Sequence, residues 1–371
     1  MIQDFQYFLS PLYQFNFERL FMKYYQEQDI LNMERIHELL EALPGFMRNY
    51  VSYMATGSTS RRTIINYVYD IRGFLTFLAD SRHMEVSAIT AEYLSKLNNF
   101  DFDEYFLHID TYQRKSSKNK SLATTNSEPG KARKLSALKS LYQFLFQYQL
   151  INLNPIAGYK LKLKRKKPVI TAMNVEEVHS VMNSVETGET LNDRQKAFAE
   201  KTKYRDTALL SLMLNTGIRV SECVGIDMED INWKEKKLNV HRKGGGDDPE
   251  VYLNDLAVQS LQDYITIERK CDDPDEHALF LSNTGHRITV RSVERIVKKY
   301  SQGAVPGKHI TPHKLRSTFG TNLYQATGDI HLTSKALNHS SIEVTASHYA
   351  DVDRRQRQEA VEIIEERYEG S

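Results

Sequence analysis

Four residues in the carboxyl-terminal part of the chain have types and a spacing suited to binding and attacking an anion. The sequence from Thr311 to Arg316 reads Thr-Pro-His-Lys-Leu-Arg. A helix that starts at this proline would present His313 and Arg316 on one face, where the two side chains can hold an anion. Further on, His339 lies in a predicted turn and Tyr349 lies near the end of a predicted short helix. The Tyr349 phenol is the candidate nucleophile.

An upstream segment supplies a second arginine. The apolar run from Thr207 to Leu214 predicts a buried helix, and Gly217 predicts a break after it. Arg219 follows the break, and Glu222 lies three residues further on, where its carboxylate could hold the guanidinium in place. Each of these pieces alone has an ordinary structural explanation, so it is their combination that favours a functional site.

In this order and in these contexts, six residues resemble the complete active-site set of the tyrosine recombinases, of the lambda-integrase and Xer type. The six residues are Arg219, Lys243, His313, Arg316, His339 and Tyr349. The resemblance covers roughly residues 46 to 355. The long amino-terminal extension further resembles the single-component XerS-like recombinases, which act without a sister subunit.

The resemblance implies that the chain cuts and rejoins double-stranded DNA without ATP. Tyr349 would form a 3′-phosphotyrosine that keeps the energy of the phosphodiester. Arg219 and Arg316 would hold the non-bridging oxygens with bidentate geometry. His313 and His339 would donate hydrogen bonds to the same oxygens, and His313 is the better candidate to accept the phenol proton. No metal or other cofactor is expected.

A predicted hairpin carries the sixth residue. Residues 238–243 alternate like a strand, residues 244–248 form a glycine-rich turn, and residues 250–253 return as a second strand. Lys243 would therefore lie at the hairpin tip. An exposed lysine beside glycines is usually solvated, and it is the resemblance that implies a role for Lys243 in protonating the departing 5′ oxygen.

Length and composition fit a soluble globular protein of two or three domains. The chain has 371 residues, 40% of them hydrophobic and 26% charged. The resemblance implies an N-terminal helical core-binding bundle (SAM-like) and a mainly helical catalytic domain with a small β-sheet, the DNA breaking-rejoining enzyme fold. The expected boundaries are an extension over 1–45, the core-binding clamp over 46–158, a basic linker over 159–168, the catalytic domain over 169–355 and a tail helix over 356–371.

The net charge of +1 does not by itself indicate a DNA-binding protein. A DNA-binding surface would therefore require basic residues to be concentrated in one part of the chain. Basic residues do cluster in the linker and on the predicted helices of the clamp, where neutralising phosphates would strengthen binding without reading sequence. The predicted DNA-contact residues are Arg61, Arg62, Lys131, Arg133, Lys134, Lys160, Lys162, Lys164, Arg165, Lys166 and Lys167.

Cysteine usage and the amino terminus bear on location. Cys223 and Cys271 are far apart and have neither a disulfide nor a metal-site spacing. The first residues show no signal-peptide pattern, and no apolar run approaches the ~20 residues of a membrane span. The expectation is a cytoplasmic protein with no membrane partner.

Apolar periodicity and caps predict the helices that must position the site. Ser60 and Asn174 are predicted N-caps. Loops are predicted over the basic segment 115–130 and the polar segment 186–201. The predicted helices start at Arg61 and near Gly130 in the clamp, and span 171–182, 204–214, 256–270 and 289–300 in the catalytic domain.

The tail and the exact role leave alternatives open. The last helix, with Val361, Ile364 and Tyr368 on one stripe, must pack on something. The resemblance implies that this helix docks on a neighbouring subunit of a homotetramer, and the alternative is that it docks on its own domain.

The preferred biological role is chromosome-dimer resolution at a dif-like site, with an FtsK-like translocase as a possible activator. The alternatives are an integrase of a mobile element, a monomeric type IB topoisomerase-like enzyme, and a DNA-binding protein with a dead site.

Two positions depart from the pattern of the resembled family. Asn338 stands where the family often has glycine, and Gly320 stands where it often has alanine. Both are packing or turn positions, so they concern local geometry rather than the chemistry.

Overall fold

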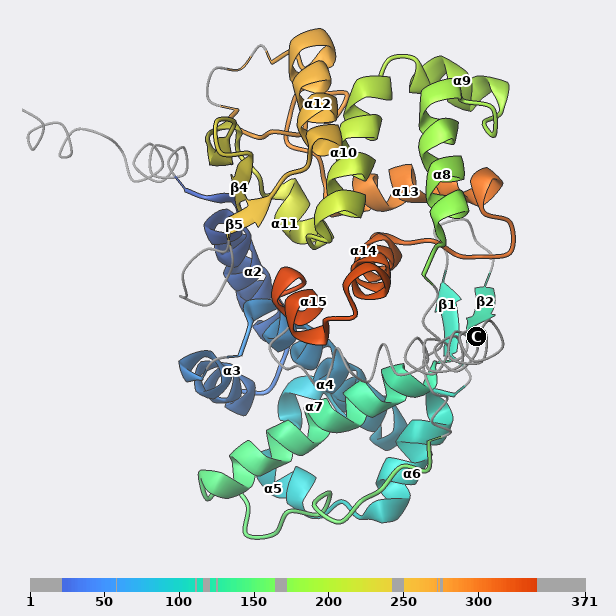
Figure 1. Cartoon of the computed structure of the whole chain (residues 1–371). Coiled ribbons are helices and arrows are strands. Elements are labelled where there is room, and N and C mark those ends of the chain that lie inside the picture. Colours follow the sequence, from blue (N-terminus) through green and yellow to red (C-terminus); the bar gives the residue numbers. More distant parts are fainter. Residues whose placement is uncertain are drawn as a thin grey trace, which may run out of the picture. The chain divides into compact units, whose positions relative to one another are not determined.

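The structure is a computed structural model that describes residues 22–57, 59–110, 112–115, 121–124, 126–163, 172–241, 250–271, 273 and 276–338 (Figure 1). Over these residues the chain is mainly helical, with one two-stranded and one three-stranded sheet. The predicted mainly α class with a small sheet is confirmed. None of the helices in these ranges is long and apolar enough to cross a membrane.

The chain divides into two compact units. Of the described residues, 22–25 and 172–338 belong to unit 1, and 26–163 belong to unit 2. The polypeptide therefore passes from one unit to the other twice, once after Tyr25 and once after Lys167.

Unit 2 is a helical bundle around an aromatic core. The core contains Tyr50, Phe74, Phe102 and Tyr142, all fully buried, and Ile36 of the amino-terminal helix belongs to the same cluster. The helices are α2 (Tyr24–Leu40), α3 (Phe46–Thr56), α4 (Arg61–Arg82), α5 (Ala91–Ser95), α6 (Asn99–His108) and α7 (Glu128–Gln147), with a 3₁₀ turn η1 (Val86–Ala88). Two short antiparallel strands, β1 (Tyr112–Lys115) and β2 (Ser121–Thr124), lie between α6 and α7.

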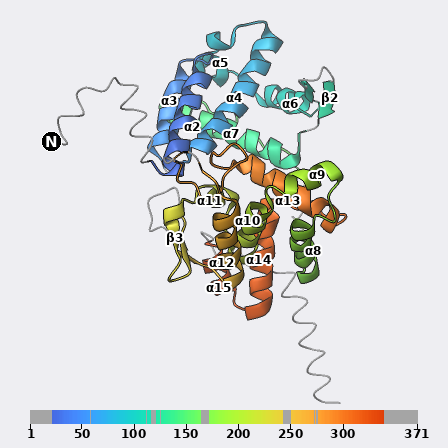
Figure 2. The same ribbon diagram turned by 90° about the horizontal axis from the view of Figure 1, so that it is seen from above.

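Unit 1 is built around one helix that is buried on nearly all sides. This helix, α10 (Lys203–Thr216), buries Leu209, Leu210, Leu212 and Met213 completely, as the apolar run predicted. It packs against α8 (Val175–Thr187), α12 (Asp255–Asp263) and α14 (Pro312–Thr327), as Figure 2 shows. The remaining helical segments are α9 (Asp193–Ala199), α11 (Val220–Val224), η2 (Met228–Asp230), the π-turn η3 (Tyr264–Glu268), α13 (Val290–Ala304) and α15 (Ile330–Ala336).

The small sheet of unit 1 has the order β3–β4–β5 and is antiparallel. Its strands are β3 (Ile231–Asn232), β4 (Lys237–Asn239) and β5 (Glu250–Tyr252). Leu238 pairs with Ile231 on one side and with Val251 on the other. The β4–β5 hairpin is the one predicted from sequence, and its tip, with Lys243, lies outside the described residues.

The predicted caps are present. The Ser60 hydroxyl accepts a hydrogen bond from the Thr63 amide at 3.1 Å, and the Asn174 side chain accepts one from the Glu177 amide at 2.8 Å. Both helices therefore begin where their capping residues predicted.

Two predicted loops were wrong. Part of the segment 186–201 is the helix α9, because Asn192 and Gln195 form a reciprocal capping box that starts a helix despite the polar composition. The basic segment 115–130 contains the paired strand β2, and α7 begins at Glu128 with Ser127 as its cap. In both places, local hydrogen bonding outweighs composition.

Candidate active site

The end of α10 delivers the first arginine. Gly217 has φ 63°, and its amide donates to the Met213 carbonyl at 3.1 Å. A Cβ at this position would lie 2.4 Å from the Phe319 ring, so glycine is required both for the backbone conformation and for space. The chain turns sharply at this glycine, and Arg219 becomes the N-cap of α11.

Glu222 holds Arg219 at two points. One carboxylate oxygen accepts from the Arg219 backbone amide at 2.8 Å, and the other accepts from its Nη1 at 2.8 Å. The Glu222 side chain is buried, whereas that of Arg219 is 44% exposed. The predicted contact is therefore present, and it fixes the guanidinium while leaving part of it open to a ligand.

Arg316 is held by backbone carbonyls instead. It lies in α14 and is only 5% exposed. Its Nη1 donates to the Gly217 carbonyl at 2.6 Å, and its Nη2 donates to the Leu337 carbonyl. These two carbonyl acceptors fix the position of the Arg316 guanidinium.

The two arginines meet at one place in unit 1. Arg219 Nη2 donates to the Asn338 carbonyl at 3.4 Å, and Arg316 donates to the preceding carbonyl, that of Leu337. Figure 1 shows the three elements involved, α11, α14 and α15, gathered together. The two guanidiniums therefore face a common segment that ends immediately before His339 in the sequence.

Asn338 occupies a left-handed backbone position, with φ 46°. Asparagine adopts this conformation more readily than most other residues, which explains how it can stand where a glycine would be expected. Gly320 is buried within α14. Neither departure disturbs the meeting of the two arginines.

The other predicted catalytic residues are only partly placed. His313 is exposed in the first turn of α14, three residues before Arg316, as predicted. Lys243, His339 and Tyr349 lie outside the described residues, as does the tail over 356–371. The structure thus brings together Arg219, Glu222 and Arg316, with His313 on the same helix as Arg316.

Three of the predicted DNA-contact residues bind carboxylates within unit 2. Arg133 and Lys134 of α7 both contact the buried Asp70 of α4, with Arg133 Nη2 at 3.0 Å and Lys134 Nζ at 2.7 Å from its Oδ1. Lys131 pairs with Asp110 and with Glu128. The contacts of Arg133 and Lys134 tie α7 to α4, and that of Lys131 ties α7 to the segment after α6.

The remaining basic candidates are less constrained by contacts or lie outside the described residues. Arg62, at the start of α4, is exposed, and so are Lys160 and Lys162 after the bundle, while Arg61 is half-buried. Lys164, Arg165, Lys166 and Lys167 of the linker lie outside the described residues. Phosphate contact by these side chains stays a prediction.

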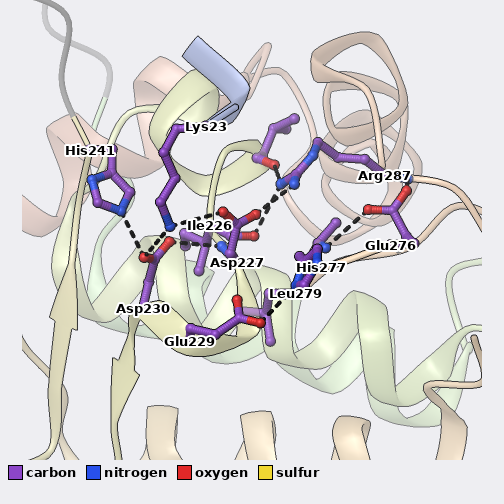
Figure 3. A network of polar contacts seen from close by, with 12 residues as sticks. Lys23, Ile226, Asp227, Glu229, Asp230, His241, Glu276, His277, Leu279 and Arg287 are labelled. Carbon is purple, nitrogen blue, oxygen red and sulfur yellow. Dashed lines mark hydrogen bonds and ion pairs between the residues drawn. The ribbon is translucent and has the colours of Figure 1, made fainter. Parts of the chain in front are cut away.

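Sequence reasoning missed a polar cluster beside the small sheet. It contains Lys23, Asp227, Asp230, His241 and Arg287, which lie up to 264 positions apart in the sequence (Figure 3). The only local signal is the Asp227–Asp230 capping box of η2, and nothing in it indicates the distant partners.

Comparison with known proteins agrees with this geometry. The profile of the phage integrase family matches residues 171–356. The chain belongs to the phage integrase family. It is 31% identical over 339 residues to tyrosine recombinase XerC of Caldanaerobacter subterraneus subsp. tengcongensis, with 87% of this chain and 88% of that protein covered. It is 32% identical over 341 residues to XerS of Streptococcus mutans serotype c, with 85% and 94% covered.

Solved structures of a recombinase and of a transposon integrase share the fold. XerH recombinase bound to a difH substrate has a TM-score of 0.56 at 20% identity, with 78% of this chain and 77% of that chain covered. The Tn1549 transposon integrase in complex with circular intermediate DNA has a TM-score of 0.59 at 20% identity, with 84% and 98% covered. The predicted assignment to the Xer-type tyrosine recombinases, and with it the class of site-specific DNA recombinase, is confirmed.

Proposed function

We propose that this recombinase cuts and rejoins double-stranded DNA through a 3′-phosphotyrosyl intermediate, with Tyr349 as the nucleophile. The observation that best supports the proposal is that Arg219 and Arg316 meet at the consecutive carbonyls of Leu337 and Asn338. Two guanidiniums that face one segment can share one phosphate, because each offers paired N–H donors to its non-bridging oxygens.

The proposed reaction moves one phosphoryl group and two protons. The Tyr349 oxygen forms a bond to phosphorus and gives its proton to His313, while the bond from phosphorus to the 5′ oxygen breaks. Lys243 protonates that oxygen as it leaves. Attack by a 5′ hydroxyl from the partner duplex then reverses these steps and releases the tyrosine. The arginines and His339 stabilise the negative charge on the phosphorus oxygens in both directions.

The wider assignment follows the relatives. The similar XerH structure is bound to a difH substrate, which favours a dif-like chromosomal site and the resolution of chromosome dimers. We further propose a homotetramer joined through the tail helix over 356–371, with a possible FtsK-like activating translocase. Arg61, Arg62, Lys160 and Lys162 are the described candidates for phosphate contact, together with the linker residues 164–167.

A nicked duplex carrying the cognate site tests the nucleophile. The nick lets a short strand diffuse away after cleavage and so traps the covalent complex, which migrates slowly on a denaturing gel. The wild-type chain is expected to form this adduct and Tyr349→Phe is expected to form none, since phenylalanine has no oxygen to bond to phosphorus. The exposed Tyr148 of unit 2 provides the control, and Tyr148→Phe is expected to retain the adduct.

Equal adduct formation by wild type and Tyr349→Phe would refute the assignment of the nucleophile. A plasmid with two sites separates the activities, because a recombinase yields two smaller circles whereas a topoisomerase-like enzyme only relaxes the plasmid. Relaxation without resolution would contradict the recombinase proposal and favour the type IB alternative.

A further inference from the structure

The start of the described chain, residues 22–25, is part of unit 1, although the rest of helix α2 belongs to unit 2. Lys23 Nζ lies 3.2 Å from Asp227 Oδ2 and 3.2 Å from Asp230 Oδ1 (Figure 3). The next residue, Tyr24, packs its ring under the Arg287 guanidinium at 5.3 Å. A Cβ on Gly225 would lie 3.0 Å from the same ring, so the tyrosine rests directly on the backbone. The segment 22–25 is thus docked on unit 1 by a charge contact and by packing.

The receiving carboxylates are both buried. Asp227 is 5% exposed and Asp230 is 4% exposed. Burial alone would raise the pKa of Asp227, but hydrogen bonds and charge from Arg287 and Lys23 outweigh it, so the pKa of this carboxyl lies below its usual value. Arg287 Nη2 reaches Asp227 Oδ1 at 2.6 Å. Asp227 is therefore held in its charged form by the positive charges of Arg287 and Lys23.

Asp230 joins this cluster to the hairpin of the proposed active site. Its Oδ2 accepts from the Asp227 amide at 2.9 Å, and its Oδ1 lies 2.7 Å from His241 Nε2. The same Oδ1 is the atom that Lys23 contacts. One carboxylate oxygen therefore binds both the docked amino-terminal segment and the residue that follows strand β4.

His241 lies two residues before Lys243 in the chain. Two residues of extended chain span at most about 7 Å, so the position of His241 limits how far Lys243 can lie from it. A general acid must be held within hydrogen-bond distance of the oxygen that it protonates, and small displacements reduce its rate. The contact of Asp230 with His241 is therefore expected to affect the rate of the protonation step.

We propose that Asp230 is a positioning residue that couples the docked segment at Lys23 to His241, which precedes the proposed general acid Lys243 by two residues in the sequence. Removing Lys23 leaves two buried carboxylates with less compensating charge, so Asp230 shifts and its hold on His241 loosens. The inference rests on the proposed function, in which Lys243 protonates the leaving 5′ oxygen. In this proposal Lys23 supports cleavage through Asp230 and His241.

The test compares Lys23→Met with Lys234→Met, a matched change at an exposed lysine in the β3–β4 turn. Single-turnover cleavage is measured on two duplexes, one normal and one with sulfur in place of the 5′ bridging oxygen. A thiolate leaves without protonation, so the sulfur substrate bypasses the general acid. Lys23→Met and His241→Ala are each expected to cleave the normal duplex on the order of tenfold more slowly and the sulfur duplex at the wild-type rate.

The two changes are also expected to be non-additive, because they remove links of the same chain of contacts. Equal slowing of Lys23→Met on both substrates, or no slowing on either, would overturn the inference. Lys234→Met is expected to match wild type on both. The Lys23→Arg variant keeps the charge and is expected to recover most of the rate.

Amide hydrogen exchange separates failure of this inference from failure of the proposed function. Lys23→Met is expected to speed exchange of the amides of Val240 and His241 relative to Lys234→Met, whether or not the protein cleaves DNA. Unchanged exchange would refute the coupling even in an active recombinase. An absent Tyr349 adduct in the wild type would instead refute the proposed function, and faster exchange would still support the coupling.

Discussion

At the scale of single residues, the two arginines of the site are held by different means. Arg219 is held by the carboxylate of Glu222, whereas Arg316 is held by the carbonyls of Gly217 and Leu337. The first arrangement fixes a partly exposed guanidinium at the expense of some of its charge. The second places a buried guanidinium against two backbone carbonyls.

Replacing Glu222 tests how Arg219 is held. Glu222→Ala removes the acceptors of both the Arg219 amide and its Nη1, and we expect cleavage to fall about 10- to 100-fold with a loss of about 1–3 kcal/mol in stability. Glu222→Gln keeps one acceptor for the amide and should lose less of both. Single-turnover cleavage and urea denaturation measure the two effects. Full activity of Glu222→Ala would show that Arg219 needs no support.

The buried Asp227 predicts a dependence of stability on pH. Because its pKa is lowered by Arg287 and Lys23, its contribution is present above the unfolded pKa, near ~3.9, and is lost as the pH falls through the folded value. Asp227→Asn should therefore be less stable than wild type at pH 7, by about 1–3 kcal/mol, and the gap should close below about pH 4. Urea denaturation at several pH values measures the gap, with the exposed Asp255→Asn as the control. A gap that stayed constant from pH 7 to pH 3 would contradict this reading.

At the scale of elements, two helices end on glycines with the same backbone conformation but different surroundings. Gly217 ends α10 with φ 63°, and Gly328 ends α14 with φ 65°. A Cβ at Gly217 meets the Phe319 ring, whereas a Cβ at Gly328 meets open space. The pair separates backbone strain from steric collision.

Substitution of these glycines follows from that difference. Gly328→Ala should lower the free energy of unfolding by about 1 kcal/mol, because alanine is strained in the left-handed backbone conformation of Gly328. Gly217→Ala should lower the free energy of unfolding by more than this. It should also slow cleavage, because Gly217 is followed by Arg219 and the Gly217 carbonyl accepts a hydrogen bond from Arg316. Thermal unfolding and adduct formation measure the two effects. Equal losses of stability in the two variants would show that the contact with Phe319 is easily relieved.

The elements also show how far the sequence could predict the fold and the site. The buried helix before Arg219, the hairpin before Lys243 and the caps Ser60 and Asn174 follow from local patterns, which act over a few residues. The helix α9 was missed because its polar composition hid a capping box at Asn192. The contact of Lys23 with Asp227 was unpredictable, since it joins residues 204 positions apart and depends on the whole packing of unit 1.

At the scale of the whole molecule, each unit has its own hydrophobic core and its own buried carboxylate that ties helices together. In unit 2, Asp70 of α4 binds Arg133 and Lys134 of α7. In unit 1, Asp206 of α10 is fully buried and binds Lys299 at 2.8 Å and Tyr300 at 2.9 Å, both in α13. Burial, with the nearby charge of Asp206, raises the pKa of Tyr300, so its hydroxyl stays a donor.

Replacing Asp206 tests whether the units are stabilised separately. Asp206→Ala leaves the charges of Arg205 and Lys299 uncompensated in a buried site, and we expect unit 1 to lose about 3–5 kcal/mol. Asp255→Ala, which removes an exposed ion pair with Lys236, should cost less than about 1 kcal/mol. Amide exchange across the whole chain should accelerate in the core of unit 1 and change little in that of unit 2. Equal acceleration in both cores would contradict separate stabilisation.

Arg219 and Arg316 are proposed to act on one phosphate, and a double-mutant cycle tests this most directly. Single-turnover cleavage of a nicked cognate duplex is measured for Arg219→Lys, Arg316→Lys and the double variant. Each single change is expected to slow cleavage about 10²- to 10³-fold, because lysine lacks the paired donors that hold two phosphate oxygens. The rate of the double variant should fall far less than the product of the two single losses. If both arginines hold the same phosphate, the first change already disrupts that site and the second change removes little more. Fully multiplicative losses, as expected for two separate sites, would contradict the claim.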